Sequence, residues 1–283
     1  MPADEKKPVI LIRRVWAQNV VSEFELIKSL LPRFHYVSID TEFPGCVFQS
    51  PSVRERNHPQ GRYQVLKLNV DALKLIQLGF TLCDADGNLP HLGTNCRYAW
   101  EFNFSDFDVS RSLHAPSAIS MLKENGIDFE RNRREGISSL HFADLMFSSG
   151  LVGNGGMHWV SFHGSYDFGY LVKILTQSSL PELLTDFMEL LTALFGSSLF
   201  DVKYIGSKMK LYGGLERLAK LLQVERSAGN AHQAGSDSLL TCQTFLKMSR
   251  KFKLEANSFA GIVYGLNEKY WACWDLFFMY LIT

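Results

Sequence analysis

Two acidic residues separated by one position follow a short apolar run near the N-terminus. The run covers residues 37–39, Asp40 and Glu42 come next, and a Pro-Gly turn at residues 44–45 ends the segment. Alternate side chains of a strand share a face, so the two acids would project together, about 6.5 Å apart along the strand. Their mutual repulsion in a partly buried place favours a divalent cation beside them. The alternative is an edge strand whose acids face water.

Three further residues, which lie later in the chain, could complete such a site. Asp167 follows a predicted buried strand, 159–162, in the first turn of a helix. His232 and Asp237 lie at the start of a long helix, and the nearby glycines allow His232 to sit on a loop that folds back towards Asp237. A histidine beside acids suits a general base that takes a proton from water. The alternatives are helix N-terminal acids and a surface histidine.

Taken together, these residues predict a site for two metal ions. Four carboxylates can hold two divalent ions about 3.5–4 Å apart, one to activate water and one to stabilise the leaving oxygen of a phosphodiester. Hard oxygen ligands favour Mg²⁺ or Mn²⁺ over zinc. The five cysteines form no CxxC pair, so we predict free thiols in a reducing compartment.

The composition indicates a large core and no broad basic surface. Hydrophobic residues make up 46% of the 283 positions, and the formal net charge is zero. Proteins that bind nucleic acid through a broad electrostatic surface carry a basic excess, so any nucleic-acid contact here is expected to be local and metal-assisted. The sequence shows no secretory signal, and the apolar stretch 271–282 is too short to span a bilayer. We therefore expect an intracellular protein with no membrane contact.

Strands and helices alternate in a way that predicts one α/β domain over residues 1–283. The predicted sheet is mixed and five-stranded, is flanked by helices, and begins with the acid-bearing strand. The other predicted strands are 75–83, 98–104, 159–162 and 199–205, and the second and third of the five are expected to pair antiparallel. Helices are predicted at 15–31, 62–74, 117–125, 136–149, 166–176, 181–195, 214–222 and 233–251.

Two polar stretches interrupt this pattern. The charged run 130–135 is predicted to be a solvated face. Residues 46–62 carry three arginines and two prolines and are predicted to form a long loop. That loop is either a solvated excursion or a lid that brings arginines to a phosphate.

Longer runs around the candidate residues resemble a known family. Segments 38–45, 166–171, 201–204 and 232–241 are similar to the Caf/Pop-type deadenylases of the DEDDh exonuclease superfamily, which are catalytic subunits of the CCR–NOT complex. The resemblance, over about residues 15–265, implies a ribonuclease H-like fold, two Mg²⁺ or Mn²⁺ ions and removal of poly(A) from mRNA 3′ ends with release of 5′-AMP. It also implies a helical scaffold partner, a second deadenylase subunit, and a location in the cytoplasm and the nucleus.

The resemblance also assigns roles to individual residues. It makes the metal ligands Asp40, Glu42, Asp167 and Asp237, and the general base His232. Asp201 lies in a family-like run but outside this set, and we predict a structural role for it. Phe43 would stack on the terminal nucleotide or pack in the core, and His163 would approach a phosphate or be buried and satisfied.

Two rival functions and one segment stay open at this point. The rivals are a general 3′ exonuclease without preference for A, and an adaptor subunit that keeps the fold with little catalysis. The tail 271–283 matches nothing in the family and is either a packed terminal helix or an exposed docking patch.

Overall fold

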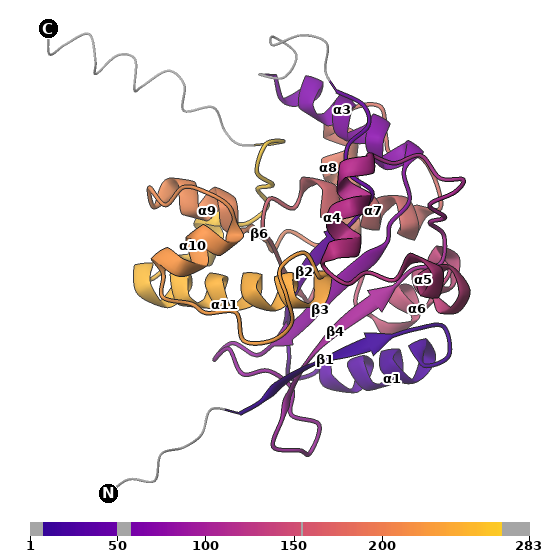
Figure 1. Cartoon of the computed structure of the whole chain (residues 1–283). Coiled ribbons are helices and arrows are strands. Elements are labelled where there is room, and N and C mark those ends of the chain that lie inside the picture. The colour runs from indigo at the N-terminus through magenta and orange to yellow at the C-terminus, as the bar shows by residue number, and fades with distance from the viewer. Residues whose placement is uncertain (1–7, 50–57, 154, 268–283) are drawn as a thin grey trace, which may run out of the picture.

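A mixed six-stranded sheet forms the centre of the computed structural model, which describes residues 8–49, 58–153 and 155–267 (Figure 1). Its strands lie in the order β1-β4-β3-β2-β5-β6. They are β1 (Ile10–Val15), β2 (Tyr36–Glu42), β3 (Gln77–Cys83), β4 (Arg97–Asn103), β5 (His158–Ser161) and β6 (Leu199–Asp201). β2, β3 and β4 pair antiparallel, whereas β1, β5 and β6 each join their neighbour in parallel.

The sheet has one strand more than the five that the sequence predicts. The additional strand is β1, which pairs with β4 at one edge of the sheet. Most β1 side chains are exposed or only half-buried. The strand therefore carries only a short apolar run, which the sequence prediction did not count as a strand. The acid-bearing strand is therefore β2, and it lies between β3 and β5 rather than at an edge. The edge-strand alternative for Asp40 and Glu42 is wrong.

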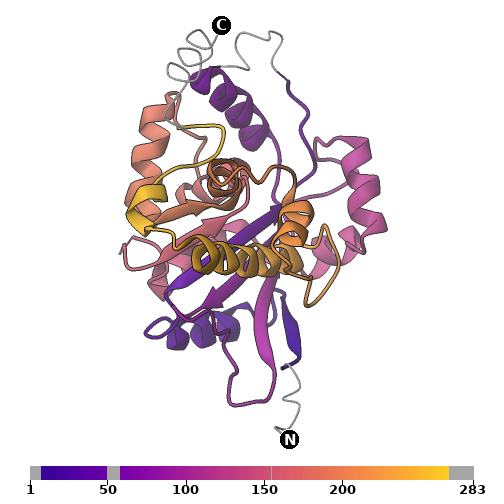
Figure 2. The same ribbon diagram turned by 90° about the vertical axis from the view of Figure 1, so that its left-hand side faces the viewer.

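Helices cover both faces of the sheet. They are α1 (Val20–Leu30), α3 (Pro59–Ala72), α4 (Pro116–Glu124), α5 (Phe129–Glu135), α6 (Ser139–Ser149), α7 (Ser165–Thr176), α8 (Leu184–Phe195), α9 (Val202–Lys208), α10 (Leu215–Leu221), α11 (Ala234–Phe252) and α12 (Ala256–Phe259). α6 packs against both α1 and α7, and α11 packs on β2 and β3. Figure 2 shows α11 lying across the strands.

Strand alternation places the core side chains and the two acids of β2 on opposite faces of the sheet. On β2, Val37 and Ile39 enter the main hydrophobic core with residues of α1, α6 and α7. Asp40 and Glu42 alternate with them and point to the side covered by α11. On β3, the hydroxyl of Thr81 lies 2.9 Å from that of Ser238 in α11, which confirms that α11 covers this second face.

Several other boundaries differ from the sequence prediction. The predicted strand 199–205 ends at Asp201, because its side chain accepts hydrogen bonds from the backbone N–H groups of Lys203 and Tyr204 and so begins α9. The charged run 130–135 belongs to α5, which Asp128 caps in the same way. α3 begins at Pro59, so the predicted loop 46–62 is shorter than expected. Residues 50–57 and the tail 271–283 lie outside the described residues, and their predictions stay untested.

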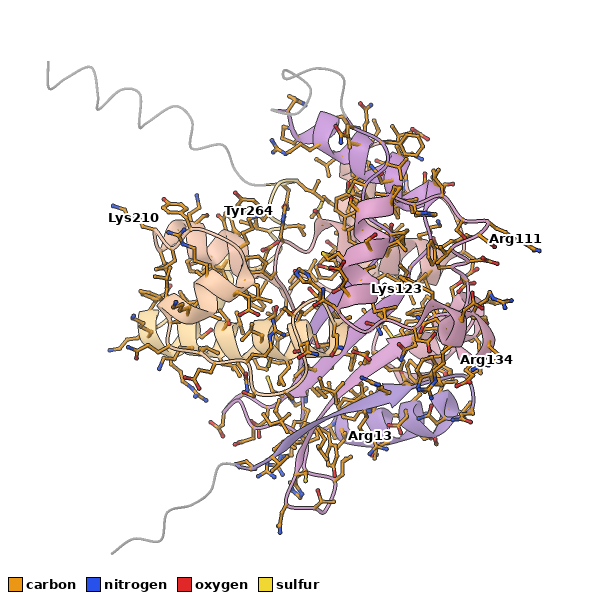
Figure 3. The ribbon with its side chains drawn as sticks, in the orientation of Figure 1. Arg13, Arg111, Lys123, Arg134, Lys210 and Tyr264 are labelled. Carbon is orange, nitrogen blue, oxygen red and sulfur yellow. The ribbon has the colours of Figure 1, made fainter. Side chains whose placement is uncertain are left out.

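The basic side chains that Figure 3 labels are distributed over separate elements. Arg13 comes from β1, Arg134 from α5 and Lys123 from α4. None of the described helices is long and apolar enough to cross a membrane.

Candidate metal centre and active site

The two acids of β2 lie directly beneath the N-terminus of α11. Asp40 is opposite Gly79 in the β2–β3 register, and a Cβ at Gly79 would lie 1.7 Å from the carbonyl oxygen of Ala234. A glycine is therefore required for α11 to approach the sheet this closely. This approach brings Asp237, in the first turn of α11, to the acids of β2.

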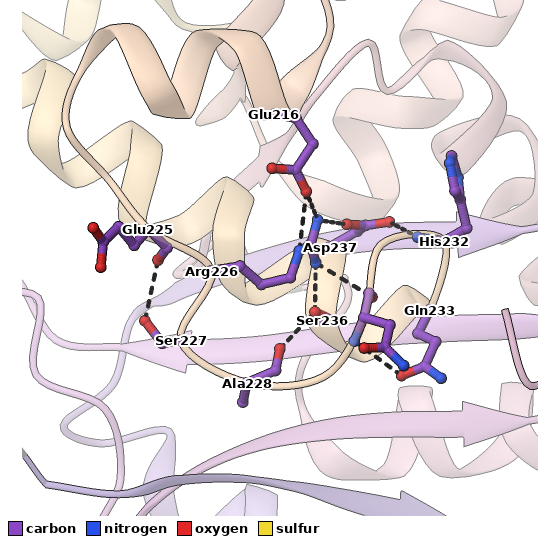
Figure 4. Close-up of polar contacts among 10 residues, drawn as sticks. Glu216, Glu225, Arg226, Ser227, Ala228, His232, Gln233, Ser236 and Asp237 are labelled. Carbon is purple, nitrogen blue, oxygen red and sulfur yellow. Dashed lines mark hydrogen bonds and ion pairs between the residues drawn. The ribbon is translucent and has the colours of Figure 1, made fainter.

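His232 lies on the loop before α11 and folds back to the same place, as predicted. Its backbone has a φ of 58°, in the left-handed region. Its backbone N–H donates a hydrogen bond of 2.9 Å to Oδ2 of Asp237 (Figure 4). Within the described part of the chain, ligand atoms of Glu42, His232 and Asp237 all lie within 4.8 Å of one another. The imidazole itself is exposed.

Asp167 enters from the end of β5, which pairs in parallel with β2. It occupies the first turn of α7, and its Oδ1 accepts a 2.5 Å hydrogen bond from the hydroxyl of Thr41. Thr41 lies between the two acids in the sequence, so a single segment supplies two carboxylates and orients a third. The side chain of Asp167 is buried, as are those of Glu42 and Asp237.

The cluster is electrostatically unfavourable without a cation. Burial, together with the charges of Asp167, Asp237 and Glu42, raises the pKa of Asp40 well above its usual value. Burial likewise raises the pKa of Glu42 to about 8 and that of Asp167 to about 7. Burial also raises the pKa of Asp237, although its neighbour Arg226 opposes the shift.

One cation does not balance four carboxylates. Among the residues that the structure describes, Arg226 is the only Lys, Arg or His side chain ion-paired to any of the four, through Asp237. Four oxygen-bearing groups with so little positive charge around them fit hard divalent ions. The residues present therefore suit Mg²⁺ or Mn²⁺.

This electrostatic arrangement predicts how pH and metal affect stability. Glu42 and Asp167 have ordinary pKa values of 4.5 and 3.8 and folded-state values of about 8 and about 7. The folded protein therefore holds more protons than the unfolded chain between about pH 4 and pH 8. In EDTA we expect the free energy of unfolding to fall as the pH rises through this window. Mn²⁺ at 100 times its Kd should raise the free energy of unfolding by about 2.7 kcal/mol.

Thermal unfolding at pH 5, 6.5 and 8, with EDTA or Mn²⁺, measures both effects. Glu42→Gln is the control, because it removes one titrating carboxylate and should flatten the decline in EDTA. A decline of equal slope in wild type and Glu42→Gln would contradict the prediction.

Comparison with known proteins places the chain in a family. Residues 15–144 match the model of the CAF1 family ribonucleases. A probable CCR4-associated factor 1 homologue of Arabidopsis thaliana is 45% identical over 263 residues, which cover 92% of this chain and 94% of that protein. The chain belongs to the CAF1 ribonuclease family. The poly(A) ribonuclease pop2 of Schizosaccharomyces pombe is 40% identical over 85% of this chain and 70% of its own length.

Solved structures of CAF1-family proteins confirm the fold that the resemblance implies. S. pombe Pop2p in a form with bound Mg²⁺ and Mn²⁺ matches with a TM-score of 0.83 and 40% identity, over 90% of this chain and 99% of that chain. A yeast CAF1 crystallised with the NOT1 MIF4G domain matches with a TM-score of 0.73 and 30% identity, over 90% and 96% of the two chains.

Asp201 has the structural role that the sequence predicts in this CAF1-family chain. Its carboxylate accepts backbone N–H bonds from His163 and Gly164 at 3.0 and 3.1 Å. It also accepts them from Lys203 and Tyr264, both at 3.0 Å. The loop after β5 leads to Asp167. Asp201 thereby connects this loop with α9 and with the C-terminal segment.

The two predicted substrate residues lie beside aromatic or basic neighbours. Phe43 is half-buried, with its ring stacked 5.0 Å from that of Tyr166. The ring of His163 is edge-on to Tyr264, and its Nδ1 lies 3.2 Å from Nζ of Lys203. His163 is exposed, so the alternative of a buried histidine is wrong. Desolvation by its neighbours, together with the charge of Lys203, lowers the pKa of His163 to about 4, so this imidazole is neutral at pH 7. The substrate contacts of Phe43 and His163 stay predictions.

Sequence reasoning missed two residues of the site. Thr41 could have been found, since it lies between the two acids and carries a hydroxyl. Arg226 carries no local signal, because its partners lie on α10 and α11 and meet only in the fold.

Proposed function

We propose that this protein is a metal-dependent 3′→5′ exoribonuclease that removes poly(A) from mRNA and releases 5′-AMP. The observation that carries the proposal is the convergence of four carboxylates and His232 at one cation-poor place between β2, α7 and α11. A family that includes a poly(A) ribonuclease supports the choice of substrate.

Two divalent ions would be held by Asp40, Glu42, Asp167 and Asp237. When bound, such ions lower the pKa of water and neutralise charge on a phosphodiester. The bound Mg²⁺ and Mn²⁺ of the similar Pop2p structure support this cofactor choice.

Residues of the chain itself would orient the catalytic groups and accept the proton. His232 presents an exposed imidazole at the edge of the cluster and would accept the proton of the attacking water. Its backbone N–H bond to Asp237 fixes the loop from which it projects. Thr41 holds Asp167 in one orientation. The attack breaks the bond between phosphorus and the 3′ oxygen of the penultimate nucleotide, so the phosphate leaves with the terminal adenosine.

The proposal places the enzyme within a larger assembly. The similar yeast CAF1 was crystallised with a NOT1 MIF4G domain, which supports a helical scaffold partner of the CCR–NOT complex here. A second deadenylase subunit, and activity in both the cytoplasm and the nucleus, complete the proposal.

Two 5′-labelled RNAs test the substrate class. They are identical except that one ends in an A-tract and the other in mixed sequence, and both are incubated with Mg²⁺ or Mn²⁺. We expect stepwise shortening of the A-tract that slows at the first non-A nucleotide. Equal trimming of both RNAs would favour a general 3′ exonuclease. No trimming of either RNA, with scaffold binding intact, would favour an adaptor subunit.

A further inference from the structure

Arg226 links three elements around the candidate active site. It lies on the loop between α10 and α11, and its side chain is only 15% exposed. Its Nη2 contacts Oδ1 of Asp237 at 2.5 Å, and its Nε donates to Oε1 of Glu216 on α10 at 3.0 Å. Its Nη1 donates to the hydroxyl of Ser236. Figure 4 shows the guanidinium between these three acceptors.

The same contacts hold both ends of the loop that carries His232. The hydroxyl of Ser236 donates to the carbonyl of Ala228 at 2.6 Å, near the start of the loop. At its other end, Oδ2 of Asp237 accepts the backbone N–H of His232. Arg226 therefore acts on the loop from two sides, through Ser236 and through Asp237.

The backbone of His232 needs such support. A residue other than glycine with a positive φ, such as His232, is held in a sparsely populated conformation that persists only where its surroundings determine it. The bond from His232 to Asp237 supplies part of that restraint. The bond is directional only while the carboxylate of Asp237 is itself fixed, and Arg226 holds the other oxygen of that carboxylate.

We propose that Arg226 is a positioning residue that fixes the carboxylate of Asp237 and, through it, the loop that presents His232. The planar guanidinium suits this place because its five donors point in fixed directions and reach three acceptors at once. A lysine ammonium is a compact charge that can keep the contact with Asp237 but not the whole set. The catalytic part of this inference rests on the proposed function, whereas the structural part does not.

Arg226→Met and Arg226→Lys test the proposal beside a matched control. Arg217→Met removes the same charge from an exposed position on α10, next to Glu216. Hydrogen exchange of the amides of residues 227–236 is measured in the metal-free protein. We expect at least about tenfold faster exchange in Arg226→Met, an intermediate increase in Arg226→Lys, and no change in Arg217→Met.

Kinetics on an RNA with a 3′ A-tract separate positioning from binding. We expect kcat to fall about 30- to 100-fold in Arg226→Met with KM within about threefold, because misplaced catalytic groups slow the chemical step. Arg226→Lys should recover part of kcat. If Arg226→Met proves too unstable to purify, Glu216→Gln replaces it, because this variant weakens one contact of Arg226 and keeps the arginine. We expect the same changes in Glu216→Gln, but smaller.

Several results would overturn the inference. They are unchanged exchange in residues 227–236, a uniform increase over the whole chain, or an effect carried by KM with kcat intact. If the wild-type protein cleaves no RNA, the proposed function fails, but hydrogen exchange still decides whether Arg226 orders the loop.

Discussion

Asp40→Asn is expected to abolish turnover while making the metal-free protein more stable. Burial, and then the charges of Asp167, Asp237 and Glu42, raise the pKa of Asp40. An amide removes that repulsion, so we expect the free energy of unfolding in EDTA at pH 8 to rise by about 1–2 kcal/mol. An amide is also a poor ligand for a divalent ion, so kcat should fall by at least about 10³-fold.

Urea unfolding in EDTA and single-turnover cleavage measure the two effects. Asp84→Asn is the matched control, because Asp84 is buried in the turn after β3 and accepts N–H bonds from Asp86 and Asn88. Those hydrogen bonds lower its pKa although burial opposes them. Its substitution should therefore decrease stability and leave kcat unchanged. If Asp40→Asn were destabilising and active, the electrostatic description of the site would be wrong.

His232→Asn is expected to lower kcat by about 10²- to 10⁴-fold with little change in metal affinity. Asparagine tolerates the left-handed backbone that His232 adopts, and it keeps the N–H that donates to Asp237. The substitution therefore removes the imidazole and preserves the loop. Turnover at saturating RNA and Mn²⁺ affinity, titrated without RNA, measure the two quantities.

The Mn²⁺ titration separates two roles for this histidine. The imidazole lies close enough to Glu42 and Asp237 to share a metal ion with them. If His232 were a ligand, Mn²⁺ affinity would fall by about 10-fold or more in His232→Asn. His141→Asn, at an exposed position on α6, is the control and should change neither kcat nor Mn²⁺ affinity.

Much of the site could be predicted because its residues are local. Asp40 and Glu42 share a strand face by alternation, and the return of His232 towards Asp237 follows from a short loop at a helix start. The limits appear where a contact depends on distant segments. The three main partners of Arg226 lie on α10 and α11, and no spacing in the sequence brings them together.

The fold was predictable to a similar degree and for similar reasons. The buried strands β2 to β5 carry clear apolar patterns, whereas β1 is an edge strand that is mostly not buried, so its pattern is short. The boundary of β6 depends on the capping bonds of Asp201. A run of apolar residues alone therefore extends the strand too far.

The chemistry of the released product tests the central claim most directly. An RNA with a 3′ A-tract is incubated with the protein and Mg²⁺ or Mn²⁺ in water enriched in ¹⁸O. The masses of the products are then measured by mass spectrometry. We predict 5′-AMP with one ¹⁸O on its phosphate, formed from the 3′ end, and no product in EDTA. A 3′-phosphate or cyclic phosphate, or release that continues in EDTA, would contradict metal-dependent attack by water at this site.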